Sequence, residues 1–342
     1  MNRVLVFGYF GNKSHIQEGQ TVKTRNMSRI FKEMGCKVDE FDTESFRYDK
    51  FAIFKMIAKL AKCEKLCLLP AYNNLKIIFP VLYVCSKLFR YDIYLFTIGG
   101  RLHIYLNSLP VHRWMMRRIK CIFNETHTLG NYLHDMHGYT NLEYCPNVKF
   151  IRFSPKKHHT EGELHLVFLA RIMKEKGIDT IFCYADWLNK QMRNNVTIDF
   201  YGMVAPKDKV YFEMQVAKYG FISYNGVAQQ DDIPHILEKY DAMLFPTHFP
   251  TEGIPGSVLD SYIAGIPVVA SDWTYARELI ENGRTGIIVP FEDNQEKFNS
   301  ACESLLNEPE KLNSMKDFAR ERAVEYHADN AKRILSKYFN CN

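Results

Sequence analysis

The chain of 342 residues lacks a long uninterrupted hydrophobic run. Its most apolar segment, residues 75–96, is interrupted by Lys76, Lys87, Arg90 and Asp92. A membrane-spanning helix needs about 20 predominantly apolar residues, and charged side chains near its middle are costly. The pattern therefore argues against a transmembrane helix in this segment.

Paired metal ligands are also lacking. The nine cysteines are an odd number, and Cys63 with Cys67 has no second pair of cysteines or histidines to complete a site. We expect free, mostly buried thiols in a reducing, cytoplasmic compartment, and neither a metal nor another cofactor. The N-terminus, MNRVLVFGYF, leads directly into a strand pattern, which predicts that no signal peptide is present.

Charge is unevenly distributed. Residues 1–150 carry 22 Lys and Arg against 12 Asp and Glu, and residues 51–120 alone carry 12 basic and 2 acidic residues. Three interpretations are open: a solvated helix face, a nucleic-acid surface, or a surface that rests on anionic lipid. No nucleic-acid motif accompanies the charge, so we expect no nucleic-acid partner. The lipid interpretation needs basic residues beside apolar ones, and it assigns the contact to Lys55, Lys59, Lys62, Arg113, Arg117 and Arg118 beside Phe51, Phe54, Trp114 and Met115.

Strand patterns alternate with helical patterns in two series. Strands are predicted at 3–8, 37–41, 65–69, 93–97, 121–124 and 142–145, and then at 164–170, 196–201, 221–224, 242–245, 268–271 and 286–289. A polar linker at 154–163 separates the series, and residues 294–339 are predicted to be helical with a break at Pro309. Such alternation is typical of parallel sheets covered by helices.

We therefore predict an α/β fold with two Rossmann-like domains that face a cleft. The domains are residues 1–153 and residues 154–325, and a C-terminal helix at 326–342 is expected to pack back toward the first domain. A cleft between two such domains is a natural meeting place for two substrates.

Two cations follow the first strand of the second series. Arg171 comes directly after that strand, and Lys176 with Gly177 precedes the next helix. Taken alone, Arg171 would be interpreted as an ordinary surface residue. Together the two cations suit a diphosphate, because the Arg guanidinium can donate two parallel hydrogen bonds and the Lys ammonium acts as a point charge.

Two carboxylates flank a later strand-to-helix turn. Glu252 lies in the loop after residues 242–245, and Asp260 lies about one turn inside the helix that follows, predicted at 257–264. A loop Glu and a solvated Asp are the simplest explanations, and a paired-carboxylate hydrolase is another. However, the helix start offers N–H groups to phosphate, and ionised carboxylates accept hydrogen bonds from sugar hydroxyls. The combination favours a nucleotide-sugar.

The segment from Glu252 to Val268 resembles the signature of retaining glycosyltransferases of family 4, which have the GT-B fold. It keeps the spacing of the two acidic residues and of the final G-x-P-V in E-G-F-G-x-x-x-x-E-A-x-A-x-G-x-P-V, and its departures from the pattern include Ile254 in place of Phe and Asp260 in place of the second Glu. Further matches are Cys145-Pro146-Asn147, Ala170-Arg171, Lys176-Gly177, Phe200-Tyr201-Gly202, Asn225-Gly226-Val227, Phe245-Pro246-Thr247, and Glu278 with Asn282-Gly283-Arg284-Thr285-Gly286.

The resemblance implies a role for each matching position. Arg171 and Lys176 would neutralise the donor diphosphate, which is the leaving group, and Glu252 would bind the transferred sugar. Asp260 would hold the ribose hydroxyls. The turn that would contact sugar and phosphate consists of Gly253, Ile254, Pro255, Gly256, Ser257 and Val258, and Gly226 with Val227 would lie near the base.

The first series carries fewer signals, because the spacing G-x-G-x-x-G is absent after its first strand. The segment with Gly19, Gln20, Thr21 and Lys23 resembles the family's glycine-rich loop against donor phosphates and acceptor. The segment from Asn74 to Leu102, which contains Ile98-Gly99-Gly100, resembles the subgroup that builds capsules and exopolysaccharides. In some family members a His of this domain contacts the reacting sugar. His103 and His127 are the candidates here. The alternative is that each is an ordinary core or surface histidine.

The resemblance implies a retaining hexosyltransferase that moves a sugar from a nucleoside-diphosphate sugar, taken to be a UDP-sugar, onto a glycan or lipid-linked acceptor in surface polysaccharide synthesis. We expect it at the cytoplasmic face of the plasma membrane. Two alternatives remain open: an epimerase or phosphorylase of the same fold, and a non-catalytic nucleotide-sugar-binding subunit of a two-chain transferase.

Overall fold

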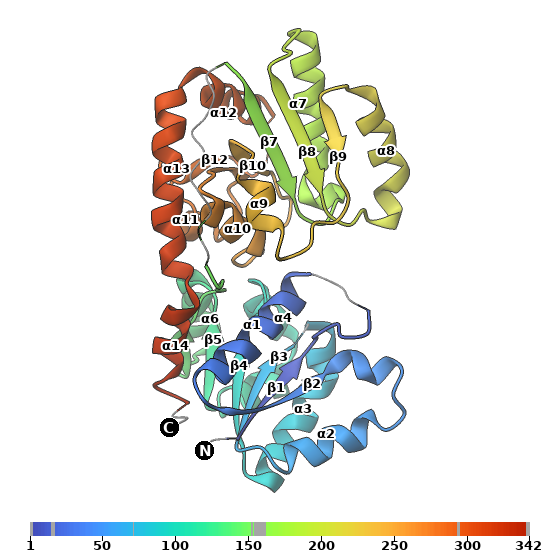
Figure 1. The fold of residues 1–342 in the computed structure, drawn as a ribbon. Helices are drawn as coiled ribbons and strands as arrows, with labels where there is room; N and C mark the ends of the chain where they lie inside the picture. Colours follow the sequence, from blue (N-terminus) through green and yellow to red (C-terminus); the bar gives the residue numbers. More distant parts are fainter. Residues whose placement is uncertain are drawn as a thin grey trace. The chain divides into compact units, whose positions relative to one another are not determined.

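The computed structural model describes residues 3–14, 18–70, 72–151, 153, 162–292 and 295–339. The chain divides into two compact units, Met1–Phe150 with Tyr326–Asn342, and Ile151–Glu325. Each unit contains a six-stranded parallel sheet flanked by helices (Figure 1). The predicted α/β class with two parallel sheets is confirmed. The predicted linker lies mostly outside the described residues, which resume at Gly162.

The first unit has the strand order β2-β1-β3-β4-β5-β6. Its strands are β1 (Arg3–Gly8), β2 (Lys37–Asp42), β3 (Lys65–Leu69), β4 (Asp92–Phe96), β5 (Cys121–Asn124) and β6 (Leu142–Tyr144). Its helices are α1 (Gly19–Glu33), η1 (Thr43–Arg47), α2 (Ala52–Leu60), α3 (Tyr72–Phe89), α4 (Leu102–Tyr105), η2 (Leu106–Ser108), α5 (Pro110–Met116), α6 (His127–His137) and α14 (Ala328–Leu335).

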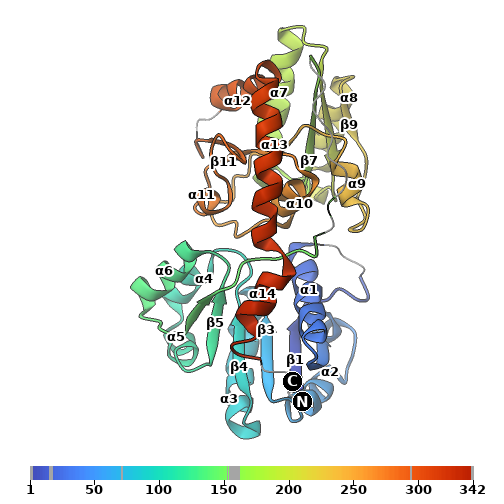
Figure 2. The same cartoon turned by 60° about the vertical axis from the view of Figure 1, so that its left-hand side comes forward.

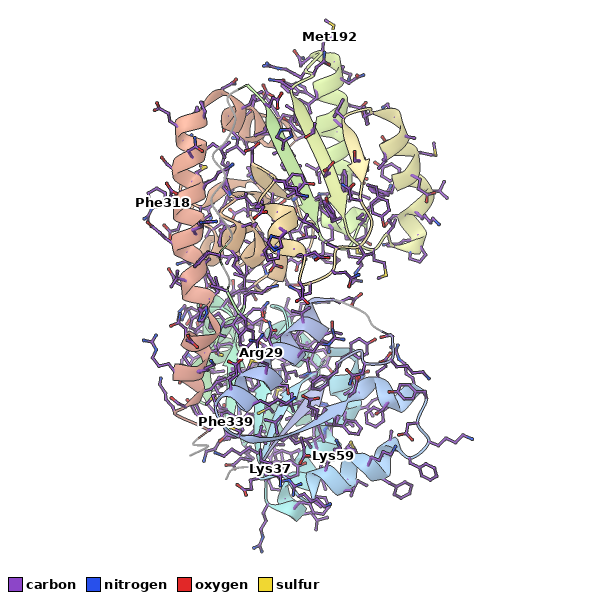
Figure 3. The ribbon with its side chains drawn as sticks, in the orientation of Figure 1. Arg29, Lys37, Lys59, Met192, Phe318 and Phe339 are labelled. Atoms are coloured by element: carbon purple, nitrogen blue, oxygen red, sulfur yellow. The ribbon has the colours of Figure 1, made fainter. Side chains whose placement is uncertain are left out.

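Helices α1 and α14 pack on one face of this sheet (Figure 2). The core there joins Phe31 of α1 and Phe96 of β4 to Leu335 of α14 and to Phe339, which Figure 3 labels; the Phe31 and Phe339 ring centroids lie 4.7 Å apart. The direction of strand order reverses at β1, and parallel crossovers are right-handed. Helices α2, α3 and α5 therefore lie on the other face.

The second unit has the strand order β12-β11-β10-β7-β8-β9. Its strands are β7 (Leu164–Leu169), β8 (Val196–Tyr201), β9 (Ile222–Tyr224), β10 (Ala242–Phe245), β11 (Val268–Ser271) and β12 (Gly286–Val289). Its helices are η3 (Lys174–Lys176), α7 (Ile178–Lys190), η4 (Pro206–Asp208), α8 (Lys209–Lys218), α9 (Ile233–Leu237), α10 (Gly256–Ala264), α11 (Ala276–Leu279), α12 (Gln295–Asn307), α13 (Pro309–Ala323) and η5 (Val324–Tyr326). Pro309 begins α13, where its missing N–H costs nothing, so the predicted helix break is confirmed.

Most described cysteines are free thiols, but Cys36 is disulfide-bonded, so the expectation of free thiols throughout is wrong at this position. Burial raises the pKa of the Cys145 thiol to about 12 and that of Cys63 to about 12. Such thiols stay protonated and poorly reactive at neutral pH. Within the described ranges, no helix is both long and apolar enough to cross a membrane.

Candidate functional site

The sheet of the second unit has a topological switch point between β7 and β10. From β7 the chain proceeds to β8 and β9 on one side, whereas β10, β11 and β12 lie on the other side. Ligands of open α/β sheets bind beyond the carboxyl ends of the strands at such a point. The loop after β7 carries Arg171 and Lys176, and the loop after β10 carries Glu252. The predicted donor-binding residues therefore share one edge of one sheet.

Lys176 and Glu252 form an ion pair across this switch point, although they are 76 residues apart in the chain. Both side chains are only 17% exposed. The Lys176 ammonium also lies 5.5 Å and 5.2 Å from the ring centroids of Phe245 and Phe249, at cation–π distance. The Thr247 hydroxyl lies 3.5 Å from the carboxylate oxygen that Lys176 contacts. The pair is thus held in a partly desolvated position, where electrostatic interactions are stronger than in water.

Gly177 allows the two loops to approach one another. Its φ of 80° is left-handed, and a Cβ at this position would lie 1.7 Å from the carbonyl oxygen of Pro246. The His248 amide donates to the Glu175 carbonyl at 2.9 Å, which links the same two loops through the backbone. The Lys-Gly pair seen in the sequence thus has a physical reason, since a side chain at Gly177 would push the β10 loop away.

Helix α10 begins beside Glu252 without a side-chain cap, because Pro255 occupies its N-cap position. The first N–H groups of a helix have no acceptor inside the helix and carry its positive dipole end. Here they belong to the turn predicted to contact sugar and phosphate, which consists of Gly253, Ile254, Pro255, Gly256, Ser257 and Val258. Asp260 lies further inside this helix and is buried.

The loops after β8 and β9 are joined to each other. The Gly202 amide donates to the Gly226 carbonyl at 2.8 Å, and the Tyr224 hydroxyl donates to the Gly202 carbonyl at 3.0 Å. Val227 follows with an exposed side chain. A Cβ at Gly202 would lie 1.8 Å from the carbonyl oxygen of Ala170, next to the exposed Arg171. The segments predicted to hold base and diphosphate are therefore neighbours along the sheet edge.

In the first unit, Lys23 is buried and forms an ion pair with Glu125. Its ammonium also donates to the Thr97 carbonyl at 2.7 Å, and the Gly99 amide donates to Glu125 at 3.1 Å. Glu125 thus ties α1 to the ends of β4 and β5. Glu125 was not among the residues predicted from the sequence; the available signal was a carboxylate directly after the buried four-residue strand β5. The ammonium of Lys23 is engaged inside the unit, and its contact with substrate stays a prediction.

The start of α1 differs from that of α10. Glu18 and Thr21 form a capping box, in which the Glu18 carboxylate accepts from the Thr21 amide and the Thr21 hydroxyl accepts from the Glu18 amide at 3.0 Å. A carboxylate already occupies this positive helix end. Gly19 is exposed and Gln20 is half-buried beside it, so contacts with an acceptor are easier to accommodate here than contacts with a phosphate.

The two candidate histidines differ in environment. His103 is buried next to Gly100, its ring centroid lies 4.7 Å from that of Tyr132, and its carbonyl accepts from His137 at 2.8 Å. Burial lowers the pKa of His103, and a hydrogen bond with the Gly100 backbone opposes this shift. His127 is exposed and stacks on Tyr144 with centroids 3.9 Å apart. Burial therefore favours the neutral imidazole of His103.

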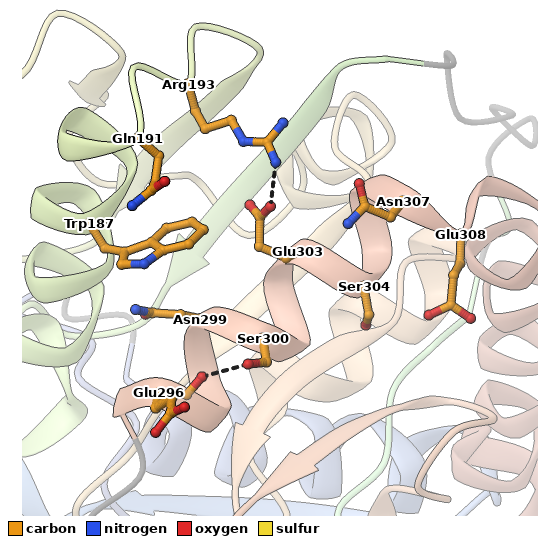
Figure 4. Close-up of a pocket in the computed structure, with 10 residues that line it drawn as sticks. All are labelled: Trp187, Gln191, Arg193, Glu296, Asn299, Ser300, Glu303, Ser304, Asn307 and Glu308. Carbon is orange, nitrogen blue, oxygen red and sulfur yellow. Dashed lines mark hydrogen bonds and ion pairs between the residues drawn. The ribbon is translucent and has the colours of Figure 1, made fainter.

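A hollow of about 570 Å³ lies elsewhere in the second unit, between α7 and α12 (Figure 4). Arg193 in its wall is paired with Glu303 at 3.0 Å, and Glu296 and Glu308 add negative charge. This lining disfavours a diphosphate. Among the residues described, no group of three His, Cys, Asp or Glu side chains is arranged to hold a metal ion.

Residues 150–322 match the model of the family described as glycosyl transferases group 1. The chain belongs to this family. It is 25% identical over 205 residues to a GDP-mannose-dependent alpha-(1-6)-phosphatidylinositol monomannoside mannosyltransferase of Mycobacterium tuberculosis, across 54% of this chain and 53% of that protein. It is also 24% identical over 131 residues to an uncharacterized 41.2 kDa protein in the cps region of Klebsiella pneumoniae, across 38% of this chain and 34% of that protein. The chain thus spans about half the length of the mycobacterial relative, and less of the other.

Two solved structures match along nearly the whole chain. A sucrose-phosphate synthase from Thermosynechococcus elongatus superposes with a TM-score of 0.77 at 12% identity, covering 99% of this chain and 98% of that chain. Anabaena HepE in complex with UDP-glucose superposes with a TM-score of 0.75 at 13% identity, covering 98% and 99%. At these identities the likeness shows the fold alone, and it confirms the GT-B fold class.

Proposed function

We propose that this protein is a glycosyltransferase that moves a sugar from a nucleoside-diphosphate sugar to an acceptor hydroxyl with retention of anomeric configuration. The observation that carries the proposal is the Lys176–Glu252 ion pair, which lies at the β7/β10 switch point beside the uncapped start of α10. Family membership supports it. One compact region thereby combines a cation, a carboxylate and free helix N–H groups.

The diphosphate is proposed to bind between Lys176, Arg171 and the first amides of α10. These groups bear positive charge or positive dipole ends, so they stabilise the negative charge that grows on the leaving diphosphate. A diphosphate would compete with Glu252 for the Lys176 ammonium. Glu252 would then be available to accept hydrogen bonds from hydroxyls of the transferred sugar.

The proposed transfer takes place on one face of the sugar. The bond between the anomeric carbon and the phosphate oxygen breaks, a bond to the acceptor oxygen forms on the same face, and the departing phosphate oxygen takes the acceptor proton. Asp260 is proposed to hold the ribose, and Gly226 with Val227 to border the base. No residue needs to supply a proton in this route.

We propose a UDP-sugar as donor. Anabaena HepE was crystallised with UDP-glucose, and the pneumococcal O-GlcNAc transferase GtfA with UDP and GlcNAc. The mycobacterial relative is named as GDP-mannose-dependent, so the choice of base is the part of the proposal that a binding panel tests most directly.

We propose a glycan or lipid-linked acceptor in surface polysaccharide synthesis. The mycobacterial relative is named for a phosphatidylinositol mannoside acceptor, and the Klebsiella relative for its place in a cps region. On the first unit, the candidates for acceptor contacts are Gly19, Gln20, Thr21, Lys23, Gly99, Gly100 and His103.

The decisive experiment measures binding, hydrolysis and transfer with a panel of UDP-, GDP-, ADP- and dTDP-sugars. Arg171→Ala and Lys176→Ala should each lower transfer by about 100-fold or more, because the leaving group loses electrostatic stabilisation. The matched control is Lys174→Ala, since Lys174 lies on the same turn and is about half exposed; this variant should retain activity.

Glu252→Gln separates catalysis from nucleotide binding. It removes the carboxylate that neutralises Lys176, so UDP should bind at least as tightly as to the wild type while transfer falls by about 100-fold. Near-normal transfer by both cation variants would remove the donor site from this edge of the sheet. A protein that binds a donor but never hydrolyses or transfers it, with cell-extract acceptors present, would instead be a binding subunit.

A further inference from the structure

Helix α3 displays a stripe of aliphatic side chains to solvent. Ile77, Val81, Val84 and Leu88 recur at intervals of three or four residues and therefore share one helix face. They are 77%, 44%, 62% and 72% exposed. Single exposed apolar residues are ordinary, but a continuous row along a helix marks a surface that contacts something else.

The opposite face of α3 is also apolar. Leu75, Phe79 and Leu82 are fully buried in the first unit. A surface helix normally has a polar outer face, and a helix that is apolar all round is normally covered on both sides. The outer face of α3 thus presents an aliphatic row where contact with water alone would favour polar residues.

Helix α5 continues this surface beside α3. Trp114 is 50% exposed, and its ring centroid lies 5.9 Å from that of Tyr83 on α3. Pro80 has no N–H to donate to the Lys76 carbonyl, and the Nε2–H of His112 on α5 donates to that carbonyl instead, at 3.0 Å. This hydrogen bond joins the two helices and gives a donor to the carbonyl that the proline leaves without its helical N–H.

Positive charge borders the stripe. Lys76 and Lys87 are exposed on α3, and the Lys87 ammonium lies 4.9 Å from the Tyr83 ring centroid. Just after the end of α5, the Arg118 guanidinium lies 4.2 Å from the ring centroid of Trp114. Across residues 51–120 the sequence has 12 basic and only 2 acidic residues. The basic side chains around the apolar stripe are therefore complementary in charge to a negatively charged surface.

We propose that this α3–α5 surface docks on an anionic lipid bilayer. It is formed by Ile77, Val81, Val84, Leu88, Trp114 and Val111, which is 57% exposed on α5, together with Lys76, Lys87 and Arg118. The aliphatic side chains would enter the boundary between headgroups and acyl chains, and the indole would lie at headgroup level. The lysines and the arginine would contact anionic headgroups. Membrane docking is separate from the proposed transferase activity, because it depends only on the residues exposed on this surface.

The structure differs in part from the lipid-contact surface that the sequence predicts. Lys59, labelled in Figure 3, donates to the Glu40 carbonyl, and Met115 is buried. Arg117 donates to the His137 carbonyl at 2.6 Å. These three side chains are engaged within the unit. Phe51 and Phe54 of the expected surface are 65% and 70% exposed, and the proposal adds to them the aliphatic stripe of α3.

The test is co-sedimentation of the whole protein with vesicles of phosphatidylcholine alone and of phosphatidylcholine with phosphatidylglycerol. The wild type should bind the anionic vesicles, and binding should weaken as salt rises because the headgroup attraction is screened. Ile77→Ser with Leu88→Ser should weaken binding by about 10-fold or more, through lost apolar burial. Lys76→Glu with Lys87→Glu should weaken it by a similar or larger factor.

Matched controls lie on the second unit. Val210→Ser with Met214→Ser changes two apolar residues of α8 that are 71% and 68% exposed, and Lys190→Glu with Lys297→Glu makes the same change of charge. Both controls should bind vesicles like the wild type. Circular dichroism verifies that each variant is folded.

Three results would overturn the proposal. They are a wild type that ignores anionic vesicles at low salt, a stripe variant that binds as the wild type does, and control variants that lose binding equally. Light scattering adds another: a wild-type dimer that the stripe substitutions dissociate, with vesicle binding unchanged, would make this surface a contact between two copies of the chain.

Discussion

Replacing Gly177 by Ala tests whether the two loops at the switch point must lie as close as they do. The new Cβ would meet the Pro246 carbonyl oxygen at 1.7 Å, and Gly177 has a φ of 80°. The left-handed backbone costs an Ala about 1–2 kcal/mol. Overpacking against a backbone atom adds about 1–3 kcal/mol. We therefore expect the free energy of unfolding to fall by about 2–5 kcal/mol.

The same substitution should impair transfer more than its effect on stability suggests. A contact of 1.7 Å must open to at least 3.0 Å, so the loops that carry Lys176 and Glu252 have to separate. A displacement of about 1 Å in a positioned group costs about 100-fold in rate. Transfer or donor hydrolysis should fall by about that factor at temperatures where the variant is fully folded, as judged by circular dichroism.

Gly283→Ala is the matched control for backbone strain. Gly283 also has a φ of 80°, but nothing lies within 4 Å of its Cβ position. It should lose only about 1–2 kcal/mol of stability and keep its activity, because the strain acts without a steric clash. Equal losses of stability in the two variants, together with normal transfer by Gly177→Ala, would refute the close approach of the loops as a requirement.

Three further predictions concern single groups. Asp260→Asn should weaken nucleoside-diphosphate binding in calorimetry while Asp260→Glu retains it, and unchanged binding by the Asn variant would exclude the ribose contact. Lys23→Met and Glu125→Gln should each lower the free energy of unfolding by about 3–5 kcal/mol in urea titrations, since each leaves a buried charge without its partner; losses below about 1 kcal/mol would contradict a buried pair. Burial lowers the folded-state pKa of His103 below its usual 6.5, so the unfolded chain binds the proton first and stability falls as pH drops below about 6.5. His103→Gln should lose less stability between about pH 7 and pH 5, and an identical pH profile would contradict this.

Much of the fold follows from local patterns in the sequence. The alternation of apolar strands with helical segments predicted every strand of both sheets to about one residue at either end. Pro309 marked the start of α13, and the strand-end loops that carry Arg171 and Glu252 were identified from their flanking strands. These features could be predicted because the periods of strand and helix, and the demands of proline, act over a few neighbouring residues.

Other features depend on contacts between distant parts of the chain. The sequence alone determined that Lys176 and Glu252 lie in strand-end loops, but only the strand order of the second sheet decided that they meet as an ion pair. The exposed stripe of α3 was hidden in the sequence within an apolar segment that resembles a core helix on both faces. Which face is covered depends on the sheet and on α5, and no local period records it, because burial is a property of the packed elements and not of the segment itself.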